Sequence, residues 1–307
     1  MPTFPAQTWV LAERRGLTID RPRIVGILNV TPDSFADGGK HNDPARALDA
    51  ANLMASQGAD MLDLGGESTR PGSARVDAAE QLRRVLPVLE AIRRDRGPAS
   101  ALPISIDTTS EAVARAALDA GAHAINDVSA GTESQDGTLR AAADHRAGLV
   151  LMHRLVPPTA DQYSDRYAEP PRYADVVQQV RAALSTRLTA ALAAGLTADQ
   201  VVLDPGLGFG KSVDDNLRLI ARTRDLLALG RPVMSALSRK SFVGRVSLGR
   251  DSHPDERLEG TLALSVLHAH AGASLFRVHD VAAHRAVLDA WRALAGLASD
   301  DGGQASA

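Results

Sequence analysis

Polar side chains stand at the ends of a series of short apolar runs in this chain. The residues are Asn29, Asp63, Asp107, Asn126, His153, Asp204, Ser238 with Lys240, and Arg277 with His279. Singly, such residues are often structural, and Asp107 could cap a helix that begins near Ser110. Together, these carboxylates, amides and cations indicate a cavity for a flat heterocycle that is rich in donors and acceptors and joined to an anion.

Two loops and one helix start add further binding groups. "TPDSFADGG" carries Phe35 at its centre, and "GGESTRPG" carries Arg70, a candidate anion ligand. "SRKS" places Arg239, Lys240 and Ser241 at the start of a helix, where free backbone N–H groups and the helix dipole favour an anion. Several cations near one mouth of a protein with a net charge of −3 indicate an anionic substrate.

The stretch "DPGLGFGKS" (204–212) looks like a phosphate-binding loop, but its spacing does not fit one. A P-loop needs four residues between its first glycine and the Gly-Lys pair, whereas only three separate Gly206 from Gly210. A dinucleotide-binding pattern also fails, because its third glycine would fall at Lys211. Lys211 therefore has no ligand role here, and we expect it to be solvated.

Composition limits the class of protein. The 307 residues are 44% hydrophobic, with a mean hydropathy of −0.11, which suits one large or two ordinary globular domains. The small negative charge offers no basic field for nucleic acid or anionic lipid. The absence of cysteine excludes disulfides, thiolate metal sites and cysteine nucleophiles. With no signal-peptide pattern and no membrane-length apolar run, we expect a cytoplasmic protein without nucleic-acid or membrane partners.

Eight apolar runs alternate with alanine- and leucine-rich segments of helical spacing. Their near-continuous apolar character suits strands buried on both faces of a parallel sheet. The runs are 24–30, 61–66, 103–108, 124–129, 148–153, 201–206, 232–237 and 274–279. Eight strand–helix units over about 250 residues predict an α/β fold, the (β/α)8 TIM barrel, whose active sites lie at the C-terminal strand ends. A doubly wound open sheet is the alternative, but it would usually carry a phosphate-binding turn after its first strand.

The remaining segments complete the predicted organisation. Residues 1–23 are expected to form a strand-turn-strand extension that caps the barrel, 24–298 the barrel itself, and 299–307 a disordered tail. Two helical stripes are assigned to the core. They are Val176, Val180, Leu184, Leu188 and Leu192, ended by the C-cap Gly195, and Leu288, Trp291 and Ala295.

Seven segments, in order, resemble the motif set of dihydropteroate synthases. They are "GILNVTPDSFADGG", "DLGGESTRPG", "SIDT", "INDVS", "DPGLGFGK", "SRKS" and "RVHDV", and they cover the chain from Ile24 to Asp280. The resemblance implies an enzyme that joins 6-hydroxymethyl-7,8-dihydropterin pyrophosphate to para-aminobenzoate, giving 7,8-dihydropteroate and pyrophosphate in folate synthesis. It also implies a TIM barrel, Mg²⁺, a homodimer and a sulfonamide target.

The resemblance also implies a role for each matching residue. Asp107, Asn126, Asp204 and Lys240 would hold the pterin, with the amide and the ammonium as donors and the Asp107 carboxylate stabilising a pterin cation. Asn29 would lie near Mg²⁺, while Arg277 and His279 would take the pyrophosphate as cations. Phe35, Thr69, Arg70 and Pro71 would come from mobile loops around the para-aminobenzoate, whose carboxylate Ser241 would receive, with Ser238 and Arg239 as further substrate-binding residues.

One segment departs from the family pattern, and two alternative functions remain. Family members often continue His-Met after the fifth strand, where this chain has Arg154 followed by Pro157 and Pro158. A methyltransferase that passes a folate methyl group to a corrinoid would share the barrel but would not need "STRPG" or "SRKS". A non-catalytic pterin-binding paralogue would lose the cations at Arg70, Lys240, Arg277 and His279, all of which are present.

Overall fold

The main sheet is a nearly closed parallel barrel. The computed structural model describes residues 7–30 and 44–300. Eight strands pair in the order β8-β7-β6-β5-β4-β3-β10-β9, and a bridge between Leu203 and Val233 joins the two outer strands of that order. The strands are β3 (Arg23–Asn29), β4 (Met61–Gly65), β5 (Ile104–Asp107), β6 (Ala124–Asp127), β7 (Gly148–Met152), β8 (Val201–Asp204), β9 (Met234–Ser235) and β10 (Leu275–Val278). The predicted TIM barrel is confirmed, and each of the eight apolar runs supplies one strand.

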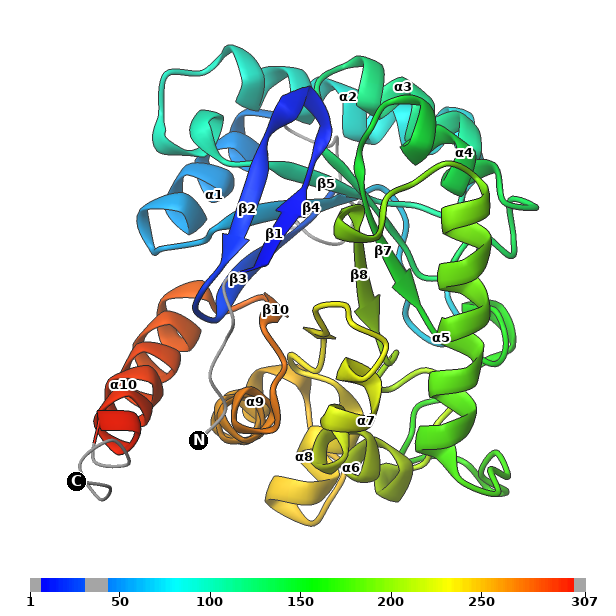
Figure 1. Ribbon diagram of the computed structural model, residues 1–307, viewed down its shortest axis with the longest axis vertical. Coiled ribbons are helices and arrows are strands. Elements are labelled where there is room, and N and C mark those ends of the chain that lie inside the picture. Colours follow the sequence, from blue (N-terminus) through cyan, green and yellow to red (C-terminus); the bar gives the residue numbers. More distant parts are fainter. Residues whose placement is uncertain (1–6, 31–43, 301–307) are drawn as a thin grey trace, which may run out of the picture.

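Helices surround the barrel on its outside (Figure 1). They are α1 (Pro44–Ser56), α2 (Ala78–Arg94), α3 (Glu111–Asp119), α4 (Gly137–Asp144), α5 (Val176–Ala193), α6 (Val213–Ala221), α7 (Thr223–Leu227), α8 (Ser241–Leu248), α9 (Leu258–Ala271) and α10 (Val281–Asp300). Several begin at a side chain that accepts a backbone N–H, as Ser110 does from Val113 at the start of α3. Ser110 is therefore the N-cap of α3, which leaves the carboxylate of Asp107 for another role.

A continuous apolar layer separates the barrel from its helices. Val176, Val180 and Leu184 of α5 are buried in it, as the i, i+4 pattern predicts. The prediction fails at the end of this stripe, where Leu192 is 42% exposed. Ala191, in the same turn, is fully buried, so this turn presents Ala191 to the core instead of Leu192. In α10, Leu288 is fully buried and Trp291 packs against the same layer.

The predicted N-terminal strand-turn-strand is present as an antiparallel pair. β1 (Gln7–Val10) and β2 (Gly16–Ile19) pair with each other and lie across one end of the barrel (Figure 1). Trp9 is 1% exposed and packs with apolar residues near the starts of the barrel strands, among them Val25 and Met61. Its indole N–H donates to the carbonyl of Gln200 at 2.8 Å. Apolar side chains thus fill the N-terminal end of the barrel, and polar chemistry is left to the opposite end.

The C-terminal helix reaches into the tail that we predicted to be disordered. α10 extends to Asp300, so the prediction is wrong for residues 299–300, and 301–307 lie outside the described residues. Within the described ranges, no helix combines the length and the apolar character that crossing a membrane requires.

Candidate active site

Strand register brings predicted site residues into one layer of the barrel. Asn29 of β3 pairs with Gly65 of β4, Gly65 with Asp107 of β5, and Asp107 with Asn126 of β6. On the next strands, Asp204 of β8 lies beside Met152 of β7. Because all these strands are parallel, the polar residues at their C-terminal ends share one mouth of the barrel.

Arg277, on β10, is the centre of a buried charge network at this mouth. Its Nε donates to Asp63 at 2.6 Å and its Nη2 donates to Asp107 at 2.7 Å. Asp63 also accepts from Ser105 Oγ at 2.5 Å and from Asn126 Nδ2 at 3.1 Å. The four strands that carry these residues are therefore tied together across the barrel. Asp63 received no role from the sequence, since its position at a strand end did not reveal that it faces Arg277.

This network leaves part of the Asn126 amide available to a ligand. Asn126 is 3% exposed, and its Oδ1 has no hydrogen-bond partner among the described residues. Because Asp63 takes only one N–H of the amide, both the unpartnered oxygen and the second N–H are left for a ligand. Asn126 thus offers an acceptor in addition to the donor that the family resemblance implied. A buried acceptor without a partner costs free energy that a bound ligand with a matching donor would recover.

Opposing effects set the charges of the network. Burial raises the pKa of Asp107 to about 7, while the nearby Arg277 guanidinium lowers it and Asp63 raises it. Burial alone would lower the pKa of Arg277, but Asp63 and Asp107 raise it above its ordinary value. The guanidinium is therefore always charged, whereas the charge of Asp107 changes near neutral pH.

Lys240, the N-cap of α8, packs against the loop between β8 and α6. Its Nζ donates to the carbonyl of Leu207 and stands 4.2 Å from the centre of the Phe209 ring. Burial lowers the pKa of Lys240 to about 8, although the carboxylate of Asp204 opposes this shift. Asp204 is 2% exposed and accepts from the N–H of Gly206 at 2.7 Å. Phe209 was not predicted as a site residue, because one phenylalanine in a glycine-rich loop carries no distinguishing pattern.

His279 is held in a neutral form beside Ser238. Ser238 Oγ lies 3.0 Å from His279 Nδ1 and accepts from the His279 backbone N–H at 3.2 Å. Burial, with Arg277 and Arg239 nearby, lowers the pKa of His279 to about 3. The ligand-free protein therefore presents a neutral imidazole rather than the predicted cation. An anion bound beside it would raise this pKa.

Arg239 and Ser241 occupy different environments. The Arg239 guanidinium makes two hydrogen bonds to Asp280, at 2.9 and 2.6 Å, and a third to Asp255 at 3.0 Å. The guanidinium of Arg239, which we assigned to substrate binding, is therefore already paired with two carboxylates. The Arg239 backbone is in the left-handed region, with a φ of 59°. Ser241 is buried in the first turn of α8, next to the N-cap Lys240.

The β4–α2 loop covers one side of the mouth. Thr69 lines a solvent-open cleft with about 480 Å³ of free space, together with Asp107 and Thr108. Arg70 is exposed, and its charge contributes to lowering the pKa of His279. Pro71 is half-buried in the same loop. Phe35, predicted from the other mobile loop, lies outside the described residues.

Comparisons with known proteins agree with this geometry. The family model described as "Pterin binding enzyme" matches residues 25–279. The dihydropteroate synthase of Escherichia coli K12 is 41% identical over 273 residues, which cover 89% of this chain and 91% of that protein. This chain belongs to the dihydropteroate synthase family.

Solved structures of the family have the same fold. The Xanthomonas albilineans enzyme with 4-aminobenzoic acid is 44% identical, covers 94% of this chain and 98% of that one, and superposes with a TM-score of 0.82. Another structure of that enzyme is a complex with 7,8-dihydropteroate. The Yersinia pestis enzyme, in a sulfonamide drug complex, is 38% identical with a TM-score of 0.82, and the match covers 93% of this chain and 98% of that one.

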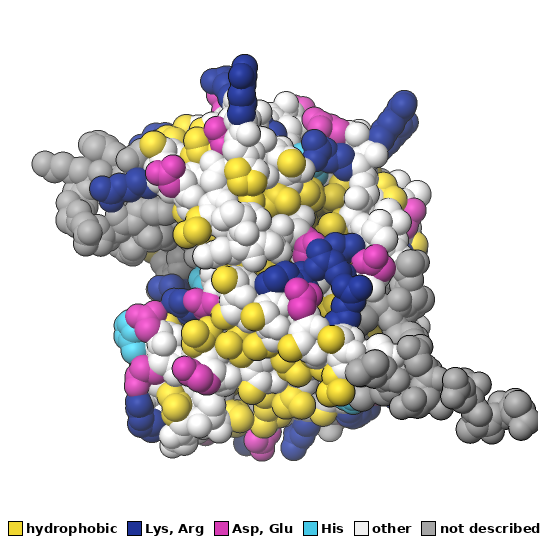
Figure 2. Space-filling model, turned by 90° about the vertical axis from the view of Figure 1, so that its left-hand side faces the viewer, with side chains coloured by type: hydrophobic (Ala, Val, Ile, Leu, Met, Phe, Trp, Pro, Cys, Tyr) yellow, Lys and Arg dark blue, Asp and Glu magenta, His cyan; other side chains and the backbone are white. Residues whose placement is uncertain are grey.

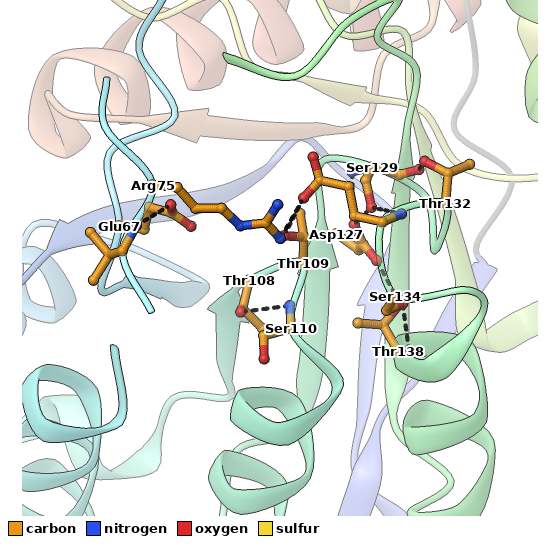
Figure 3. Close-up of polar contacts among 12 residues, drawn as sticks. Glu67, Arg75, Thr108, Thr109, Ser110, Asp127, Ser129, Thr132, Ser134 and Thr138 are labelled. Carbon is orange, nitrogen blue, oxygen red and sulfur yellow. Dashed lines mark hydrogen bonds and ion pairs between the residues drawn. The ribbon is translucent and has the colours of Figure 1, made fainter. Parts of the chain in front are cut away.

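The departure at Arg154 has a structural explanation. The Arg154 side chain is 7% exposed and pairs with Glu133, which also accepts from Thr109 Oγ1 at 2.8 Å and from Arg75 at 3.3 Å. Figure 3 shows Arg75 reaching from the β4–α2 loop to this cluster, beside Thr108 and Thr109. Arg154 thus connects the β7–α5 segment to the β4–α2 loop through Glu133.

The prediction for Lys211 is wrong. This lysine is 0% exposed, and its Nζ is within hydrogen-bond distance of Gly206 O, Phe209 O and His153 Nδ1. Lysine is rarely fully buried without partners. The spacing of the glycines excluded a phosphate-binding loop, but it could not show that the lysine is itself bound by the loop. The backbone carbonyls of the glycine-rich loop face a buried amine.

Direct titration of the lysines would test these environments. The chain has three lysines, Lys40, Lys211 and Lys240, so ¹³Cε labelling gives three assignable signals. We expect Lys240 to titrate near 8 and Lys211 near 7, because burial disfavours the ammonium of each. Above pH 8, Lys240 loses a donor proton, and kcat/KM for the pterin substrate should fall as pH rises. Titration of both near 10.5 would contradict this assignment.

Proposed function

We propose that this protein condenses 6-hydroxymethyl-7,8-dihydropterin pyrophosphate with para-aminobenzoate to give 7,8-dihydropteroate and pyrophosphate. The observation that carries the proposal is the buried pair of Arg277 and Asp107 beside Asn126 Oδ1, an acceptor without a partner among the described residues. Carboxylates and an amide oxygen suit the amino and ring N–H groups of a pterin, and Lys240 suits its carbonyl. Binding of 4-aminobenzoic acid and 7,8-dihydropteroate by the Xanthomonas albilineans relative supports both substrates.

The proposed mechanism follows from the charges of the site. The C–O bond to pyrophosphate breaks with its electron pair on oxygen, and the dihydropterin delocalises the resulting cation. Asp107, as the carboxylate, stabilises that cation, and Arg277 and His279 donate hydrogen bonds to the leaving group. The aniline nitrogen then attacks the exocyclic carbon and loses a proton. No covalent enzyme intermediate is needed.

The amide oxygen of Asn29 is a ligand type that Mg²⁺ accepts. Asn29 lies beside Gly65, where a Cβ would stand 3.4 Å from Asn29 Oδ1 and 3.6 Å from Asp107 Cβ, so both residues border the same space. Among the described residues, no group of three His, Cys, Asp or Glu side chains could hold a metal ion. Mg²⁺ commonly takes few protein ligands and completes its shell with phosphates and water. We propose that Asn29 holds it with the pyrophosphate, whose negative charge it would neutralise.

The first experiment measures pyrophosphate release from the dihydropterin substrate, with and without para-aminobenzoate and Mg²⁺. We expect release that depends on both, formation of dihydropteroate, and loss of activity with a chelator. Retained pterin binding without release would favour the non-catalytic paralogue. Methyl transfer from a methylated folate to a corrinoid would favour the methyltransferase. The sulfonamide complex of the Yersinia pestis relative supports sulfonamide inhibition, which the same assay can measure.

We further propose a homodimer in the cytoplasm, as the family resemblance implies. Leu267 of α9 and Leu294 of α10 are 57% and 62% exposed. Hydrophobic side chains gather on the lower half of the face in Figure 2. Exposed apolar area of this kind is typical of an interface. Light scattering should give twice the 32.3 kDa chain mass, and a stable monomer would refute the dimer.

A further inference from the structure

Lysine is rare in this chain and concentrated at the proposed site. The 34 basic residues include only three lysines, and two of them, Lys211 and Lys240, lie at the mouth of the barrel. Elsewhere the chain uses arginine. A lysine carries a compact charge with three donors around one nitrogen, which arginine cannot reproduce. The position of Lys211 therefore calls for a compact ammonium.

Acceptors around Lys211 match such an ammonium. Phe209 O lies 2.8 Å from its Nζ, Gly206 O lies 3.0 Å away and His153 Nδ1 lies 3.1 Å away. Burial lowers the pKa of His153 to about 3, so its imidazole is neutral and Nδ1 can accept. With the backbone carbonyl of His153 at 3.3 Å, the three N–H groups meet four acceptors, which lowers the cost of burying the charge.

The glycines allow the loop to turn its carbonyls inward. Gly206 has a φ of 68°, and a side chain there would collide with the carbonyl of His153. Gly208 has a φ of 82°, and a Cβ there would lie 2.7 Å from Lys240 Cδ. A P-loop directs N–H groups to a phosphate, whereas this loop directs carbonyls to a cation. The glycine-rich stretch is therefore built around its own lysine.

The same loop contacts Lys240 from its other side. Leu207 O accepts from Lys240 Nζ, Gly208 packs on the Lys240 stem, and the Phe209 ring lies under its ammonium. Lys211 donates to the carbonyls of Gly206 and Phe209, the first and last residues of the segment 206–209. We propose that Lys211 is a positioning residue, which holds 206–209 in the conformation that orients Lys240 toward the substrates. This inference rests on the proposed function and adds a residue to it.

Lys211→Met tests the proposal, because methionine keeps the length of the stem and removes the ammonium. We expect a folded protein whose kcat falls about 100-fold, the loss typical of a misplaced reacting group, while the Kd for the pterin substrate changes less than about tenfold. The ε-protons of Lys240, next to the Nζ that stands 4.2 Å from the centre of the Phe209 ring, should lose their upfield ring-current shift. Wild-type kcat, or an unchanged Lys240 signal, would overturn the proposal.

Two matched variants separate positioning from general damage. Tyr173→Phe removes a 2.8 Å hydrogen bond to Gly210 O, in the same loop but beyond the stretch that contacts Lys240. We expect its kcat to stay within about threefold of wild type, since exposed or peripheral changes have small effects. Lys211→Cys gives the chain its only thiol, and aminoethylation in denaturant followed by refolding rebuilds a lysine analogue. Recovery of kcat and of the Lys240 shift is expected. Failure of recovery in material that refolds like treated wild type would contradict the proposal.

The wild-type protein supplies a test that needs no variant and no activity. The charged and titratable groups around Lys211 are His153, Asp161, Asp204, Asp215 and Lys240. If the loop couples the two lysines, the ring-current shift of Lys240 should change at the pH where Lys211 itself titrates, in addition to its own titration. A single inflection would overturn the proposal even if Lys211→Met did not fold. If the coupling is present but no dihydropteroate forms, the proposed function fails and the structural inference stands.

Discussion

Replacing Asp107 with asparagine is expected to lower kcat about 1,000-fold while the Kd for the dihydropterin substrate changes less than about tenfold. Asparagine keeps an oxygen where Arg277 Nη2 donates at 2.7 Å, so the pterin pocket retains its shape. It removes the negative charge that the proposed mechanism places beside the pterin cation. Single-turnover pyrophosphate release and calorimetric pterin binding measure the two quantities separately.

Asp127→Asn is the matched control for this charge removal. Asp127 is a buried carboxylate on the neighbouring strand, and it accepts from Ser129, Gly131 and Thr138, as Figure 3 shows in part. Its loss should lower thermal stability but leave the kcat of the folded protein within about tenfold. Substantial turnover by the Asp107 variant, or an equal loss of kcat in both variants, would contradict the proposal that the Asp107 carboxylate stabilises the pterin cation.

The sequence was sufficient to predict the barrel because its signals are local. Each parallel strand reads as a short apolar run, and each run ends in a residue whose position at the mouth follows from the fold alone. Asp107, Asn126 and Asp204 were found in this way. Their pairing was not, because it depends on which side chains face each other across the barrel. Asp63 and its bond to Arg277 join residues 214 positions apart in the chain.

Predictions made from the local sequence were wrong or incomplete where the environment of a side chain depends on tertiary packing. Lys211 follows three glycines, a context that indicates an open loop, and nothing nearby in sequence reveals that His153 approaches from another strand. Glu133 and Arg154 are ordinary charged residues until the β4–α2 and β7–α5 segments meet. His279 was predicted as a cation from its residue type, but the charge of a histidine depends on its burial and on the charges around it.

Replacing Arg277 with methionine is expected to give the largest loss of stability among single changes at the site. The guanidinium separates Asp63 from Asp107, which are 1% and 6% exposed. Its removal leaves two buried carboxylates without a countercharge, and breaking a buried pair typically costs about 3–5 kcal/mol. Turnover should also become undetectable, because the pterin site and the leaving-group donor are lost together. Chemical denaturation and pyrophosphate release check the two effects.

The stability deficit should depend on pH with a definite sign. The pKa of Asp107 is about 7 in the folded wild type, above the ordinary 3.8 of an unfolded chain, and without Arg277 it would rise further. A group whose pKa is raised by folding favours the native state below its unfolded pKa, and that contribution is lost as pH rises through the folded value. Well below pH 7 both folded proteins hold Asp107 protonated, so this part of the deficit should be nearly constant there. The deficit relative to wild type should grow as pH rises through 7 toward 8, where the wild type loses this proton and the variant keeps it.

A second substitution separates charge from contact in this network. Arg277→Met combined with Asp63→Asn removes one of the two uncompensated carboxylates, so part of the lost free energy of unfolding should return and its pH dependence should weaken. Turnover should not return, because Arg277 and the acceptor that orients Asn126 are both changed. A double variant no more stable than Arg277→Met would mean that the guanidinium acts through packing rather than through its charge. Recovery of turnover in the double variant would instead show that the reaction does not need the cation at the centre of the barrel mouth.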